Sequence, residues 1–258
     1  MKLALFSPYG LSHSEAGLLY LVGNYLLKRG ADVVQLRCDG AFGICGRDTK
    51  VPGGRNVMTC ARCIGEQKSL ASWISCKTKE VSSYLVSDDV VQSAKWLSSV
   101  KSCDLSRAEF RGVNLWSVCA GEFALRYPET SVSELSVAEE ASLRQLYTTY
   151  VHAVVAAERF ITAASPTLHL VAGKQDPLAR AYVSQAHASG VEVGVFFCDT
   201  VEEGVVVESH QTGERYVSPL VLHGITSMRS DPRTWAPEVT ATVHEILTLL
   251  GYAPDRIT

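Results

Sequence analysis

The feature that most constrains this chain is a dense group of cysteines between Cys38 and Cys76. Five of its eight cysteines fall in this segment, at positions 38, 45, 60, 63 and 76. Between them lie turn residues, a composition not typical of helices or strands: Gly40, Gly43, Gly46, Pro52, Gly53 and Gly54. We therefore predict a loop without regular secondary structure over residues 38–76. So long a loop inside a compact domain needs something to hold it, and the cysteines are the obvious candidates.

The spacing of these cysteines predicts a metal site. Cys60 and Cys63 form a C-x-x-C motif, which brings two sulfur atoms close together. Fourteen residues separate Cys45 from Cys60 and twelve separate Cys63 from Cys76, so each outer cysteine can return to the same point. Four thiolates suit tetrahedral zinc, our first choice because the loop looks structural, or an iron–sulfur cluster. Cys38 ends a predicted strand and could replace Cys45 as a ligand.

Two other uses of these cysteines stay open, disulfide bonds and inert buried thiols. The sequence passes from Met1-Lys2 directly into an apolar run, without the pattern of a signal peptide. We therefore expect a cytoplasmic protein, in which disulfides are disfavoured. The remaining cysteines, Cys103, Cys119 and Cys198, are scattered, and we expect them to pack in the core.

The composition is that of a soluble globular protein. Of 258 residues, 47% are hydrophobic and 20% are charged, and the formal net charge is −3. This slightly acidic balance argues against nucleic-acid binding, which requires a basic surface. No run of apolar residues is long enough to predict a membrane span.

The order of apolar segments predicts an α/β fold. Two strand–helix–strand units stand out, and their strands are continuous apolar runs typical of buried parallel strands. They cover residues 2–7, 14–30 and 32–38, and then residues 167–171, 177–190 and 191–198. We predict a three-layer sandwich with a mainly parallel, Rossmann-like sheet and a cysteine-rich metal-binding loop.

Several further elements complete this prediction. A long helix begins near Val137, a last helix begins near Pro237, and residues 113–118 suit a short strand. Residues 205–207 and 216–222 suit additional strands or a hairpin. We interpret residues 1–258 as one domain, with the cysteine loop inserted after the second strand and residues 201–258 as an extension. The loop then lies at the carboxyl edge of the sheet, where open α/β sheets bind ligands.

Five residues are candidates for chemistry. His13, in the loop after the first strand, could act as a general base, with Glu15 orienting it. Glu122 stands in an otherwise apolar stretch, Lys174 precedes a helix and could meet an anionic group, and Asp199 follows a strand. The plainer alternatives are a solvated loop histidine, surface carboxylates, and Glu15 complementing a helix amino terminus.

Other catalytic and phosphate-binding signals are weak or absent. Arg180 is a further candidate for an anionic group, less well placed than Lys174 if it follows the helix surface. The sequence holds no G-x-S-x-G motif and no glycine-rich phosphate loop, so we do not interpret it as a hydrolase or a P-loop protein.

The arrangement resembles a known family. The order of a strand, the Ser12-His13 loop, a helix, a strand ending in residues 36–40, and then Cys45 with the C-x-x-C motif resembles the amino-terminal half of bacterial surface-polysaccharide glycosyltransferases of the two-Rossmann (GT-B) class. Residues 121–123, 144–160 and 170–173 are also similar, so the resemblance covers residues 1 to about 200. It implies a sugar or nucleotide-sugar ligand and a role in surface glycan assembly.

The sequence departs from that family where the second domain would begin. Residues 201–258 are too few for the Rossmann domain that binds the donor sugar in GT-B enzymes. We therefore expect that the chain alone transfers no sugar and that a protein partner supplies the second domain. The alternative is a non-catalytic α/β scaffold or partner-binding module stapled by its metal.

Overall fold

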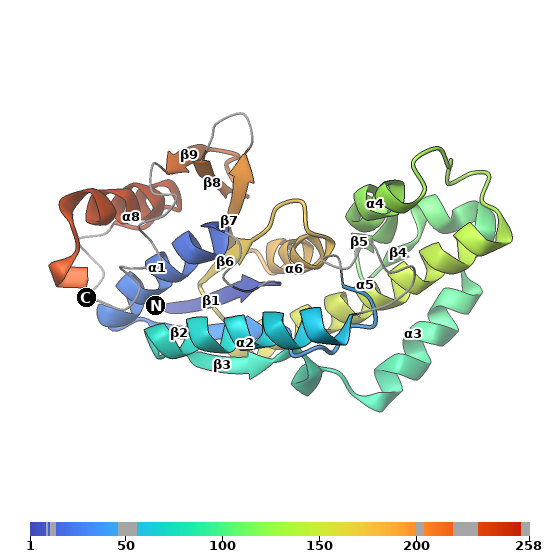
Figure 1. Ribbon diagram of the computed structural model, residues 1–258, viewed down its shortest axis with the longest axis horizontal. Helices are drawn as coiled ribbons and strands as arrows, with labels where there is room; N and C mark the ends of the chain where they lie inside the picture. The colour runs from blue at the N-terminus through green and yellow to red at the C-terminus, as the bar shows by residue number, and fades with distance from the viewer. Residues whose placement is uncertain (9, 11–13, 46–55, 200–203, 219–231, 254–258) are drawn as a thin grey trace.

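The computed structural model describes residues 1–8, 10, 14–45, 56–199, 204–218 and 232–253 (Figure 1). Its centre is a mixed, mainly parallel seven-stranded sheet in the order β3-β2-β1-β6-β7-β8-β9. Strands β1, β2, β3, β6 and β7 run parallel, and β8 and β9 add an antiparallel edge. The strands are β1 (Lys2–Ser7), β2 (Asp32–Arg37), β3 (Lys77–Glu80), β6 (Leu168–Ala172), β7 (Glu192–Asp199), β8 (Gly204–Ser209) and β9 (Arg215–Ser218). The predicted α/β class and its mainly parallel sheet are confirmed.

Successive side chains of β1 belong alternately to two hydrophobic clusters, which shows that the sheet is buried on both faces. Leu3 and Leu5 belong to one hydrophobic cluster, whereas Ala4 and Phe6 belong to the other. Helices α1 (Ser14–Lys28), α2 (Val57–Ile74) and α8 (Pro237–Leu249) contribute to the first cluster. Helices α5 (Val137–Ala164) and α6 (Pro177–Ala188) contribute to the second. A central strand covered on both sides needs apolar residues at every position, which is why β1 shows no polar alternation in the sequence.

Both predicted strand–helix–strand units are present. In the first unit, helix α1 connects β1 to β2, and these two strands pair in parallel. In the second unit, helix α6 connects β6 to β7, which also pair in parallel. Gly30 lies just after the first helix and has a φ of 88°, a backbone conformation that would be strained in a residue with a side chain. Asp176 caps α6 by accepting a hydrogen bond from the backbone N–H of Ala179 at 3.0 Å, with Pro177 at the first helical position.

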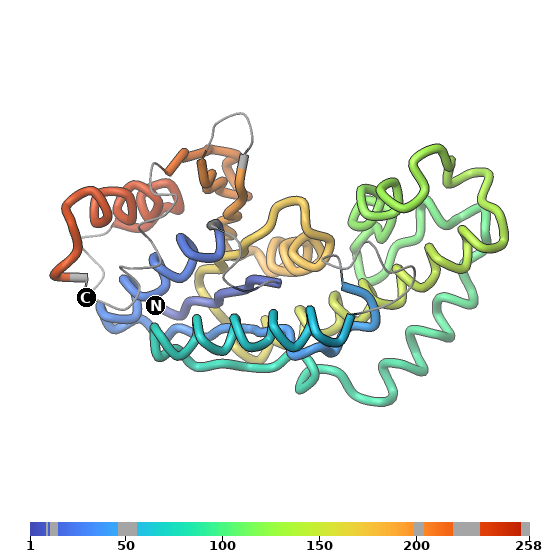
Figure 2. The backbone as a smooth tube through the Cα atoms, viewed as in Figure 1, coloured from blue at the N-terminus to red at the C-terminus, as the bar shows by residue number. Residues whose placement is uncertain are grey.

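A helical lobe extends from one end of the sheet along α5 (Figures 1 and 2). Helices α3 (Ser87–Ser99) and α4 (Leu115–Arg126) pack against α5, together with the short hairpin of β4 (Glu109–Phe110) and β5 (Val113–Asn114). Arg144 on α5 links this helix to the carboxyl-terminal end of α3 by donating hydrogen bonds to the carbonyl oxygens of Leu97 and Val100 at 2.8 and 2.9 Å. This lobe matters for function because α4 reaches the carboxyl edge of the sheet and carries Glu122 to it.

The structure differs from the prediction of an irregular loop over residues 38–76. Residues 57–74 form helix α2, while residues 46–55 lie outside the described part of the chain. The side chain of Asn56 caps the helix by accepting hydrogen bonds from the backbone N–H groups of Met58 and Thr59. One helical stripe is buried: Cys63, Gln67, Leu70, Ala71 and Ile74. The described residues 38–45 hold no helix or strand, as predicted, but the prediction is wrong for residues 57–74.

Two smaller expectations have mixed outcomes. The predicted carboxyl-terminal hairpin is present as β8 and β9, which pair antiparallel. The strand predicted over residues 113–118 is wrong beyond Asn114, because α4 begins at Leu115, where the side chain of Asn114 caps it.

Among the described residues, no helix combines the length and apolar character required to cross a membrane.

Candidate functional site

A cleft of about 530 Å³, lined by both charged and apolar residues, opens at the carboxyl edge of the sheet. It is lined by the turn after β6, the end of β7, the first turns of α1 and α6, and one face of α4. Strand β1 pairs with β2 on one side and β6 on the other, so the chain order reverses between β1 and β6. Open α/β sheets bind their ligands at such a reversal, and the volume suits a small organic molecule.

Three of the residues predicted from sequence line this cleft together. They are Glu15 on α1, Glu122 on α4 and Lys174 in the turn after β6. The predicted general base His13 lies outside the described residues. Asp199 is the last residue of β7, but its side chain also lies outside the described part. The structure therefore brings together residues that are up to 159 positions apart in the sequence.

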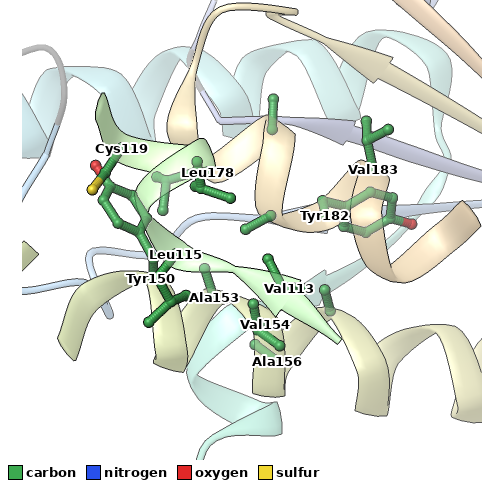
Figure 3. Close-up of a cluster of buried hydrophobic side chains, with 14 of the residues drawn as sticks. Val113, Leu115, Cys119, Tyr150, Ala153, Val154, Ala156, Leu178, Tyr182 and Val183 are labelled. Atoms are coloured by element: carbon green, nitrogen blue, oxygen red, sulfur yellow. The ribbon is translucent and has the colours of Figure 1, made fainter. Parts of the chain in front are cut away.

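Glu122 is held rigidly at the wall of the cleft next to α5. Arg126 donates a hydrogen bond to its carboxylate at 2.7 Å, and both side chains are almost fully buried. The hydroxyl of Tyr150 donates a further hydrogen bond to the same carboxylate. Burial, and then the Glu122 charge, raise the pKa of Tyr150 well above its usual value. Figure 3 shows Tyr150 beside Cys119, among the apolar side chains beneath this wall.

The two cations of the cleft differ in their partners. Lys174 donates to both carboxylate oxygens of Glu208, at 2.7 and 2.6 Å, and stands 4.7 Å from the ring centre of Phe197. Burial alone would raise the pKa of Glu208, but hydrogen bonds from Lys174 and Arg215 lower it. Arg180, on the second turn of α6, has no ion pair within the described ranges. It lines both the cleft and an adjoining hollow of about 270 Å³.

Cys198 lies in the cleft rather than in the core, contrary to the expectation from sequence. Its thiol donates a hydrogen bond to the carboxylate of Glu15, with sulfur and oxygen 3.0 Å apart. Burial, and then this carboxylate, raise the pKa of Cys198 to about 11. The thiol is therefore protonated at neutral pH and is not a nucleophile in this state. No local sequence pattern indicates this pair, because its members are on α1 and β7.

A second, much smaller cavity gathers four cysteines. Cys38, Cys45, Cys60 and Cys63 line a space of about 20 Å³ beside Pro8. The cavity lies near the carboxyl ends of β1 and β2, on the same edge of the sheet as the cleft.

Three of the predicted ligands, Cys45, Cys60 and Cys63, line this cavity together with Cys38, whereas Cys76 does not line it. Cys76 follows the carboxyl-terminal end of α2 and packs against the first hydrophobic cluster. Eleven helical positions separate Cys63 from the last residue of α2, which corresponds to roughly 16 Å along the axis.

The thiol of Cys38 is close enough to the other three thiols of the cavity for them to affect its pKa. Burial raises the pKa of Cys38 to about 12, a hydrogen bond from Gly40 opposes this shift, and the neighbouring Cys45, Cys63 and Cys60 raise it further. All eight cysteines are free thiols. Within the described ranges, no three His, Cys, Asp or Glu side chains are already arranged to hold a metal ion.

The sequence matches no protein-family model. A search of curated proteins likewise finds no match. The function must therefore be argued from the cleft and the cysteine cavity.

Proposed function

We propose that this protein is a glycosyltransferase-like component of surface glycan assembly, whose cleft at the carboxyl edge of the sheet binds a sugar carrying a phosphate or diphosphate group. The observation that carries the proposal is the cleft of about 530 Å³ at the carboxyl edge, where Glu15, Glu122, Lys174 and Arg180 meet. Its volume lies within the usual range for small-molecule sites, roughly 300–1,000 Å³. The sequence resemblance to the amino-terminal half of GT-B enzymes supports the same ligand class.

Arg180 is the residue best suited to receive the phosphate. It has no carboxylate partner in the described part of the chain, whereas Lys174 is neutralised by Glu208. Arg180 also lies on the second turn of α6, where the positive end of the helix dipole favours an anion. A guanidinium can donate two parallel hydrogen bonds to phosphate oxygens, which gives orientation as well as affinity.

The opposite wall of the cleft suits a sugar. The carboxylates of Glu15 and Glu122 accept hydrogen bonds, which is the chemistry that sugar hydroxyls require. Glu122 is fixed by Arg126 and Tyr150, so it presents an acceptor in one position without a further loss of side-chain entropy. The described residues form one seven-stranded sheet and the small β4–β5 pair, and the second wall of a GT-B cleft would come from a partner domain.

Equilibrium binding of nucleotide-sugars tests this proposal. A panel of uridine, guanosine and cytidine nucleotide-sugars is titrated by calorimetry into wild-type protein, Arg180→Ala and the control Arg107→Ala. Arg107 is exposed and lies outside the cleft. Loss of a charge-assisted bidentate contact corresponds to roughly 2 kcal/mol, so we expect about 30-fold weaker binding for Arg180→Ala and unchanged binding for the control. Equal binding by all three proteins, or binding of no member of the panel, contradicts the proposal.

A second candidate function, a non-catalytic metal-stapled scaffold, is favoured by the cavity that gathers four cysteines. Such a module would keep its fold and its metal without binding any nucleotide-sugar. The same titration therefore separates the two candidates. Multiple-turnover sugar transfer by the chain alone would contradict both the scaffold and the expected need for a partner domain.

A further inference from the structure

The cysteine cavity carries an inference that does not depend on the proposed ligand of the cleft. Two of its thiols are presented by the first turns of α2, where Cys60 and Cys63 are three positions apart on one helix face. Residues with this spacing are neighbours on a helix surface, about 5–6 Å apart at their Cβ atoms. Helix α2 therefore provides two sulfur donors in a fixed relation, close to the positive end of its dipole.

The other two thiols come from the segment that leaves the carboxyl end of β2. Cys38 follows the last residue of the strand directly, and Gly40, with a φ of 86°, lets the chain turn there. Phe42 and Ile44 are buried in the second hydrophobic cluster and anchor this segment beside α2. Cys45 then reaches the same cavity as Cys38. Four sulfur donors thus come from two independently anchored segments.

We infer that Cys38, Cys45, Cys60 and Cys63 form a four-thiolate site for a single thiophilic cation, with zinc as the expected ion. Four thiolates around one centre satisfy the tetrahedral preference of zinc. The cavity of about 20 Å³ has room for roughly one water-sized particle. That volume suits a single ion better than an iron–sulfur cluster, which brings several iron and sulfide atoms.

Binding must draw the sulfur atoms inward, because the described residues hold no preformed coordination group. Zinc–sulfur bonds of about 2.3 Å require sulfur atoms roughly 3.8 Å apart in a tetrahedron. Each thiol loses its proton as its Zn–S bond forms, so binding of one Zn²⁺ to four thiols releases up to about four protons. The amide of Gln67 donates a hydrogen bond to the sulfur of Cys63 at 3.6 Å, and this contact would help to orient that ligand.

Metal content of matched variants tests the ligand set. Full-length wild-type protein, Cys38→Ser, Cys63→Ser and the controls Cys76→Ser and Cys103→Ser are purified anaerobically and analysed for zinc and iron. We expect about one zinc per chain in the wild type and both controls, and at least a tenfold loss in Cys38→Ser and Cys63→Ser. Replacement by cobalt should give the visible absorption of a tetrahedral thiolate site in the same three proteins only. Wild-type protein without zinc, stoichiometric iron with sulfide, or loss of zinc in Cys76→Ser would overturn the inference.

A measurement on the wild type covers the case in which a cysteine variant does not fold. The protein is alkylated with and without added zinc, and each modified cysteine is identified by mass spectrometry. Zinc should slow alkylation of Cys38, Cys45, Cys60 and Cys63 at least tenfold and leave the exposed Cys103 unchanged. Equal alkylation of the four cavity cysteines with and without zinc would overturn the inference, whatever the variants show.

Discussion

The buried histidine of strand β6 makes the folding stability of this protein depend on pH. His169 is fully buried, with β1 on one side of its strand and β7 on the other. Its Nδ1 atom lies 3.0 Å from the hydroxyl oxygen of Tyr182, while its Nε2 atom has no hydrogen-bond partner among the described residues. Burial lowers the pKa of His169 from 6.5 to about 4. The folded protein therefore holds this imidazole in its neutral form.

The size of the effect follows from the two pKa values. The pKa of His169 is lower in the folded state than in the unfolded state. As the pH falls through about 6.5, His169 therefore becomes protonated in the unfolded chain but stays neutral in the folded protein. The free energy of unfolding therefore decreases between about pH 7 and pH 4 and levels off below. The full loss is about 3 kcal/mol, of which about 2 kcal/mol is already reached near pH 5. Buried Asp and Glu ion pairs contribute mainly below this window, because their pKa values are lowered.

Urea unfolding followed by circular dichroism at about pH 7.5 and pH 5 measures this loss. We expect His169→Asn, which keeps a polar group near the Nδ1 position but does not titrate, to lose about 2 kcal/mol less than the wild type on acidification. Tyr182→Phe removes only the hydroxyl partner and should keep the pH dependence, since burial is its cause. If His169→Asn and the wild type lose the same stability between these pH values, the reasoning is refuted.

Two further predictions concern a buried ion pair and the packing around a glycine. Glu122→Gln should lower the free energy of unfolding by about 3 kcal/mol, because it leaves the buried Arg126 guanidinium without its counter-charge, and a urea titration near neutral pH measures it. An unchanged midpoint would show that this pair is not a structural ion pair. Gly194→Ala should cost about 1–3 kcal/mol, because a Cβ atom there would stand 2.9 Å from a methyl carbon of Leu250. Gly121→Ala, with open space around the new methyl group, should instead be neutral or stabilising, and thermal melting that ranks the two alike would contradict this account.

Much of the sheet could be predicted from local sequence patterns. Continuous apolar runs in β1, β6 and β7 require burial on both faces, and a parallel sheet covered by helices provides it. The 28-residue helix α5 follows from its helical period and from the Ser136 cap, whose side chain accepts a hydrogen bond from the backbone N–H of Glu139. These features succeed because the signal and the structure it specifies lie within the same few turns of chain.

The cysteine segment shows where local patterns mislead. Gly40 correctly indicates a turn after β2, but helix α2 depends on the Asn56 cap and on a stripe of residues that is only partly hydrophobic. Gln67 is fully buried in that stripe, which a purely apolar criterion would reject. Once α2 is a helix, Cys76 is carried to its far end and Cys38 lies nearer to the C-x-x-C motif. Spacing along the chain alone could not separate these two cysteines, because it does not give the direction of the helix.

The site itself was decided by tertiary structure. The sequence by itself determined that the ends of β1, β6 and β7 share one edge, which makes Lys174 a candidate. It identifies Glu15 only as a possible partner of His13, and Glu122 only as a carboxylate in an otherwise apolar stretch. It did not show that Glu208 neutralises Lys174 and leaves Arg180 as the cation without an ion pair in the described part of the cleft. Nor did it show the contact between Cys198 and Glu15, which are 183 positions apart. Such contacts depend on how helices pack across the sheet, and that packing is a sum of many weak interactions that no single segment of sequence encodes.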